Sequence, residues 1–115
     1  MDFLNKEEYY GNIEYKLYIN PKKKERLLSQ FFFRMREGNG RAFYYIGIHD
    51  YGKLYITDLK YLLPSIKTFI NIISNSCKYN VRIFVKKPYV FALVYCYNPA
   101  ISNYDDIIDF NVNLN

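Results

Sequence analysis

Residues 13–21, Ile-Glu-Tyr-Lys-Leu-Tyr-Ile-Asn-Pro, decide the fold because they pass directly from a strand pattern to a helix start. Apolar and polar side chains alternate from Ile13 to Ile19, which is typical of a half-buried strand. Asn20 is a good N-cap, and Pro21 suits the first position of a helix. The sequence therefore predicts a strand over 13–19 that is followed at once by a helix.

The predicted helix covers residues 21–37, where large apolar residues recur at helical spacing. Gly38 follows the last periodic residue and is the expected stop. Further along, the patterns predict a strand over 42–49, a turn at 50–52, a return strand over 53–57, a helix over 58–75, and strands over 79–87 and 89–97. Pro64 lies inside the second helix, so we expect either a kink or a new helix that begins at Pro64.

This order of elements, β-α-β-β-α-β-β, predicts an α+β fold. We expect a two-layer sandwich, a mainly antiparallel sheet with two helices on one face. Residues 1–12 are interpreted as an N-terminal arm, 13–98 as a basic domain, and 99–115 as an acidic tail that includes Asp105, Asp106 and Asp109.

The composition of the 115 residues excludes several classes of protein. The chain is 50% hydrophobic, too apolar for a disordered protein, and its two cysteines are too few for a disulfide scaffold. No apolar stretch approaches the roughly 18 residues of a membrane span, and the start lacks the pattern of a signal peptide. We therefore expect a reduced, soluble, cytoplasmic protein of one domain.

Residues suited to catalysis are few, and we expect no enzyme, cofactor or metal. His49 is the single histidine, and Cys77 and Cys96 are interpreted as small buried hydrophobes. The segment 47–53 matches the GxxxxGK of a phosphate-binding loop, but Leu54 stands where Ser or Thr is needed and the segment reads as a hairpin.

Charge is strongly segregated along the chain. Residues 16–87 hold 15 of the 16 basic residues and only four acids, whereas residues 88–115 hold no base. Four cations occupy the first turns of the first helix, where they oppose the helix dipole, so a phosphate partner would favour them. A solvated basic face is the plainer alternative. The candidate RNA-binding residues are Lys22, Lys23, Lys24, Arg26, Arg34, Arg36, Arg41, Tyr51, Lys53, Arg82, Lys86 and Lys87, with Tyr51 placed to stack on a base.

Several motifs resemble the N-terminal domain of the GTP-binding protein 1 and 2 family, translational GTPases related to elongation factor 1-alpha. They are Ile-Glu-Tyr-Lys-Leu at 13–17, Arg-Leu-Leu-Ser-Gln at 26–30, Glu-Gly-Asn-Gly-Arg-Ala at 37–42, and Tyr-Tyr-Ile-Gly-Ile-His-Asp-Tyr-Gly at 44–52. The resemblance covers roughly residues 13 to 87. The family has an acidic residue where Arg41 stands, and its GTPase domain has no counterpart here, so no GTP hydrolysis is expected.

The resemblance implies a ribosome-facing domain, and a free-standing domain of this kind is similar to the dormancy factors of microsporidian ribosomes. The expected function is to bind rRNA and ribosomal proteins and to block a tRNA site, the exit site, with no membrane or DNA partner. Two rival hypotheses stay open. One is a protein–protein adaptor of a GTPase-related pathway that does not bind RNA. The other is a small acyl or phosphate hydrolase, disfavoured because Pro21 has no N–H for an anion loop.

Overall fold

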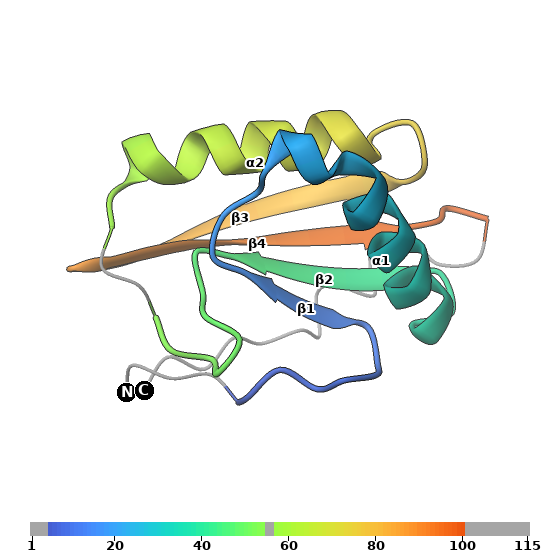
Figure 1. The fold of residues 1–115 in the computed structure, drawn as a ribbon, viewed down its shortest axis with the longest axis horizontal. Coiled ribbons are helices and arrows are strands. Elements are labelled where there is room, and N and C mark those ends of the chain that lie inside the picture. Colours follow the sequence, from blue (N-terminus) through green and yellow to red (C-terminus); the bar gives the residue numbers. More distant parts are fainter. Residues whose placement is uncertain (1–4, 55–56, 101–115) are drawn as a thin grey trace.

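A computed structural model describes residues 5–54 and 57–100, and these form a four-stranded sheet with two α-helices (Figure 1). The elements in chain order are β1 (Ile13–Lys16), a 3₁₀ turn η1 (Pro21–Lys23), α1 (Lys24–Glu37), β2 (Arg41–Ile46), α2 (Leu59–Ile73), β3 (Lys78–Lys86) and β4 (Tyr89–Tyr97).

The sheet has the strand order β1-β2-β4-β3. The β1–β2 pair is parallel, and the other two pairs are antiparallel. Both helices lie on the same side of the sheet (Figure 1). The predicted two-layer α+β sandwich with a mainly antiparallel sheet is therefore confirmed. The single parallel pair arises because α1 carries the chain from the end of β1 back to the start of β2.

The first strand is shorter than predicted because the chain leaves the sheet after Lys16. The last strand contact is the bond from the Gly47 N–H to the Lys16 carbonyl, at 2.7 Å. Ile19 then turns into the core, and its N–H donates to the Oγ of Ser65 on α2 at 3.0 Å. The Asn20 side chain accepts from the Lys22 N–H, as the N-cap prediction requires, although the first turn is 3₁₀ rather than α.

The end of α1 depends on three consecutive small residues. The Gly40 N–H donates to the Met35 carbonyl at 2.8 Å, and the Asn39 N–H donates to the Arg36 carbonyl at 3.2 Å. These two bonds are those of a Schellman motif, in which Asn39 takes the left-handed conformation at φ 53°. Gly38 is required for a different reason, since a Cβ there would collide with the Arg41 carbonyl oxygen.

The second helix begins at an Asp58 N-cap and runs unbroken through Pro64 to Ile73. The alternative of a new helix at Pro64 is therefore wrong. Proline removes the bond to the carbonyl four residues earlier, that of Lys60. Both Lys60 and Pro64 are exposed, so water can satisfy that carbonyl without breaking the helix.

The return strand predicted over 53–57 is not formed in the described part of that segment. Only an isolated bridge links Ile48 to Leu54, next to the bond from the His49 N–H to the Lys53 carbonyl at 3.0 Å. Gly47 and Gly52 both have positive φ, which turns the chain away from the line of β2 and across the sheet. Residues 55–56 lie outside the described residues.

Two apolar clusters sandwich the sheet. The cluster on the helix side includes Phe31 and Phe69 from the helices and Tyr44 from β2. The second cluster is on the other face and includes Tyr45, Phe91 and two residues of the 47–54 loop, Ile48 and Leu54. This second cluster explains why β2 and β4 are apolar at nearly every position, a pattern typical of strands buried on both faces.

Candidate anion-binding site

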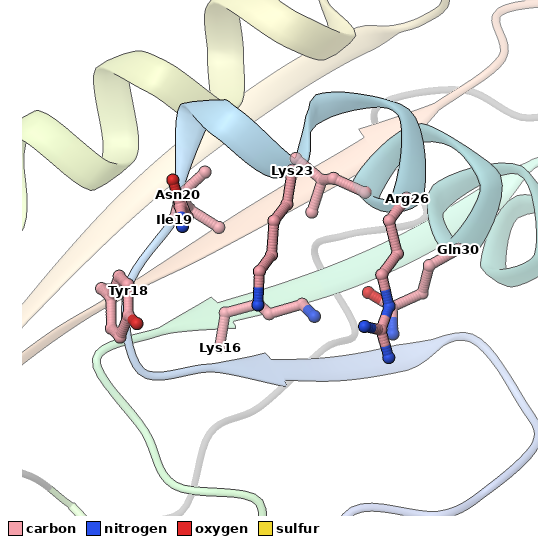
Figure 2. A pocket seen from close by; sticks show the side chains of 8 residues that line it. Lys16, Tyr18, Ile19, Asn20, Lys23, Arg26 and Gln30 are labelled. Atoms are coloured by element: carbon pink, nitrogen blue, oxygen red, sulfur yellow. The ribbon is translucent and has the colours of Figure 1, made fainter.

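A pocket of about 280 Å³ lies between the end of β1 and the start of α1 (Figure 2). Its lining is mostly polar and carries no acidic residue. The lining residues are Lys16, Tyr18, Ile19, Asn20, Lys23, Arg26, Leu27 and Gln30. The pocket forms because the chain leaves the sheet after Lys16 and is held toward α2 by the bond from the Ile19 N–H to Ser65. This path leaves a hollow between β1 and the first turn of the helix.

Three cations from different parts of the chain point into this hollow. Figure 2 shows Lys23 and Arg26 reaching down from the start of the helix toward β1, where Lys16 lies. Among the described residues, Glu14 is the acid that pairs with one of these cations, and its Oε2 lies 4.0 Å from the Lys16 Nζ. Three like charges around one hollow repel one another, so an anion that enters it lowers their electrostatic energy.

The start of the helix adds to this positive potential. The first N–H groups of a helix lack intrahelical partners and carry a partial positive charge. Glu25 is the single acid in the first turn of α1, whereas Lys22 and Lys23 of η1 and Lys24 at the start of α1 are all exposed. The predicted conflict between cations and helix dipole is thus present in the folded protein. A phosphate group is the kind of ligand that removes this conflict.

The predicted RNA-binding residues do not form one surface. Lys22, Lys23, Lys24 and Arg26 gather at the start of α1, and Arg36 lies at the opposite end of that helix. Arg41 is half-buried at the start of β2. Tyr51 and Lys53 lie on the 47–54 loop, while Arg82, Lys86 and Lys87 lie on β3 and its hairpin, at the edge of the sheet opposite β1.

Arg34 is a correction to the prediction, because it is buried inside the protein. It is only 4% exposed, and its Nε donates to the Oε1 of Glu14 at 2.8 Å. Its other guanidinium nitrogens donate to the carbonyls of Gly11 at 2.8 Å and Glu8 at 3.0 Å. Arg34 therefore ties the predicted N-terminal arm to β1 and α1, and it has no surface to offer a phosphate.

Lys16 and Gln30 belong to the pocket but were not among the predicted residues. Lys16 occupies a polar position of the strand pattern, which reads simply as a solvent-facing residue. Its role depends on the chain turning back over it after Ile19, and strand periodicity holds no information on that contact. Gln30 lies four residues after Arg26 and lines the same wall of the pocket. The i, i+4 spacing places both residues on one face of α1, so the sequence alone could have indicated this neighbour.

A second hollow adjoins the pocket and shares Arg26 and Gln30 with it, but it is lined by acids of the N-terminal segment. The pKa of the Glu7 carboxyl is raised to about 7, mainly by burial and also by a hydrogen bond with Glu14. Two carboxyls that share a proton carry one charge fewer near neutral pH. The acidic hollow therefore carries less negative charge than its number of carboxyl groups suggests. It weakens the positive potential of the basic pocket correspondingly less.

The structure also separates Cys96 from His49, the single histidine. Cys96 pairs with Ala42 near the start of β2, whereas His49 follows the other end of that strand. Cys96 is buried, and burial raises its thiol pKa well above the usual value. Among residues 5–54 and 57–100, no three His, Cys, Asp or Glu side chains are grouped so that they can hold a metal ion.

Neither helix of the described ranges has the length and apolar character needed to cross a membrane. The tail residues Asp105, Asp106 and Asp109 lie outside the part of the chain that the structure describes.

The sequence is similar to part of GTP-binding protein 2 from mouse and from human. In both cases 41% of 69 residues are identical. The match covers 57% of this chain but only 12% of the relative, so the chain spans a small part of the length of these proteins. No protein-family model and no solved structure matches the chain. These comparisons support the resemblance to a GTPase-related family and lend no support to the dormancy-factor resemblance.

Proposed function

We propose that this protein is a non-enzymatic RNA-binding protein that takes a backbone phosphate of RNA in the pocket formed by Lys16, Lys23 and Arg26. The observation that carries the proposal is that these three cations, from β1, η1 and α1, point into one hollow at a helix start. Arginine offers a planar fork of donors to phosphate oxygens, and lysine adds a mobile charge. The exposed Lys22 and Lys24 on the same turn extend the positive surface to neighbouring phosphates.

The partner proposed here is the ribosome, with contacts to rRNA and to ribosomal proteins in the cytoplasm. Support comes from the resemblance of residues 13–52 to a domain of translational GTPases and from the identity with part of GTP-binding protein 2. By occupying a tRNA site, the exit site in our proposal, the protein would hold the ribosome inactive by exclusion alone, without a chemical step. Such a role is that of a dormancy factor.

Salt dependence tests whether phosphates carry the binding. Affinity for a fluorescent single-stranded RNA and co-sedimentation with ribosomes are measured over a salt series. Each phosphate neutralised contributes about 0.7–0.9 to the slope of log affinity against log salt. The double variant Lys23→Gln/Arg26→Gln should reduce that slope by about 1.4–1.8 and lower affinity for all sequences alike. Lys67→Gln, an exposed change on α2, is the matched control and should leave the slope unchanged.

Two results would contradict the proposal. Co-sedimentation that persists unchanged at high salt would mean that phosphate contacts do not dominate. Co-sedimentation that the double variant leaves intact would mean that the pocket does not face the RNA, and it would favour the adaptor hypothesis.

A further inference from the structure

The strand β3 forms one edge of the sheet and offers its outer side for pairing. It is nine residues long and is the last strand in the order β1-β2-β4-β3. Within residues 5–54 and 57–100 its only strand partner is β4, which it pairs with along its full length. The backbone N–H and C=O groups on its outer side therefore face away from the sheet, as on any edge strand that can accept a further strand.

The two faces of β3 differ in chemistry. Lys78, Arg82 and Lys86 recur at every fourth position, so all three lie on one face, and all three are exposed. The other face presents apolar side chains, with Tyr79 and Ile83 each 41% exposed and Val85 62% exposed. An edge strand that is cationic on one face and apolar on the other is complementary to a strand that is acidic on one face and apolar on the other.

We propose that the β3 edge binds an extended segment of a partner protein that carries acidic residues at every fourth position and apolar residues between them. The segment adds to the sheet as an antiparallel strand. Its acids then lie opposite Lys78, Arg82 and Lys86, and its apolar side chains lie beside Ile83 and Val85. This inference does not rest on RNA binding by the basic pocket, which lies on other elements.

The charges of β3 argue against a second copy of this chain as the occupant. Two copies paired antiparallel about Arg82 would place Arg82 opposite Arg82 and Lys78 opposite Lys86. Like charges directly opposite each other destabilise a strand pair, so the cations that favour an acidic partner also prevent self-association.

The apolar residues argue against RNA as the occupant of this edge. RNA would contact the cations but would leave Ile83 and Val85 exposed to water. In addition, an apolar hollow of about 840 Å³ lies beside Val85, between the start of α2 and the β3–β4 hairpin, and is lined by Tyr61, Pro88 and Val90. It is large enough to accept an apolar side chain of an added strand.

The test uses the full chain and a labelled peptide, Glu-Val-Thr-Val-Glu-Val-Thr-Val-Glu, whose binding is measured by fluorescence anisotropy. Two further peptides of identical charge carry N-methyl groups, one at its even positions and the other at its odd positions. N-methylation removes the N–H donors from one edge of the peptide. Strand addition therefore predicts that one methylated peptide binds like the parent and the other loses at least tenfold in affinity.

Charge is tested separately with protein variants. Arg82→Glu should weaken the parent peptide about fivefold or more, because it replaces an attractive cross-strand pair with a repulsive one. Lys23→Glu, in the basic pocket, should leave peptide affinity unchanged and so separates this proposal from RNA binding. The proposal would be overturned by equal affinity for both methylated peptides or by the absence of binding of the parent peptide. It would also be overturned if RNA displaced the peptide from the wild-type protein but not from the Arg82→Glu variant.

Discussion

Replacing Arg34 by alanine should destabilise the protein far more than any other arginine replacement on α1. The change leaves the Glu14 carboxylate, which is 3% exposed, without the guanidinium that lies 2.8 Å from it. It also removes the two donors to the carbonyls of Gly11 and Glu8. Breaking a buried ion pair by removing one partner costs about 3–5 kcal/mol, and a domain of this size has about 5–15 kcal/mol in total.

The assay is thermal and urea unfolding followed by circular dichroism. A loss of at least 3 kcal/mol corresponds to a fall in melting temperature of at least about 12 °C for a domain of roughly 100 residues. Arg36→Ala is the matched control, because Arg36 is exposed on the same helix and surface changes stay within about 0.5 kcal/mol. The double variant Arg34→Met/Glu14→Gln removes both charges and should recover part of the loss.

The reasoning fails if Arg34→Ala unfolds at the same temperature as Arg36→Ala. That result would mean that Arg34 is not buried against Glu14 in solution. Arg34 would then return to the set of possible phosphate ligands.

Two further predictions concern Gly38 and Glu7. Gly38→Ala should lower the free energy of unfolding, measured with urea, by about 1–3 kcal/mol. The added Cβ would collide with the Arg41 carbonyl oxygen and lie 2.7 Å from the Asn12 Cβ. A variant as stable as the wild type would contradict this close approach. The Glu7 pKa is raised from about 4.5 to about 7, so the folded protein retains a proton that the unfolded chain releases, and stability should fall as pH rises from about 4.5 to 7. This pH-dependent loss of stability should be on the order of 1 kcal/mol after solvent screening. It should disappear in Glu7→Gln and persist in Glu8→Gln, a control at an exposed position. A loss that persists in Glu7→Gln would show that another group causes it.

Local signals in the sequence predict most of the secondary structure. Asn20 with Pro21 and the small residues after Glu37 mark the two ends of the first helical segment, because capping depends on residues a few positions apart. The same is true of Asp58, whose side chain caps α2. All four strand ends of the β3–β4 hairpin are predicted to within one residue, because the pattern is long and the turn contains Pro88.

Contacts between distant residues account for what the sequence did not reveal. Lys16 joins Lys23 and Arg26 only because Ile19 is held by Ser65, which lies 46 residues further along the chain. Arg34 reads as one more surface cation in the sequence, but its partner Glu14 lies 20 residues away on β1. In the described part of the predicted return strand only the bridge at Leu54 forms, because Gly47 redirects the chain, and turn signals alone do not give that direction.

The register of the sheet places the chain just before β1 and the chain just after β4 on either side of β2. The Asn12 carbonyl accepts from the Phe43 N–H, and the Asn98 N–H donates to the Gly40 carbonyl, so both points flank the first residues of β2. Two strands on either side of a third are separated by about 10 Å. A polypeptide much longer than this one can therefore carry the unit as an insertion between neighbouring points, with no need to span the width of the domain.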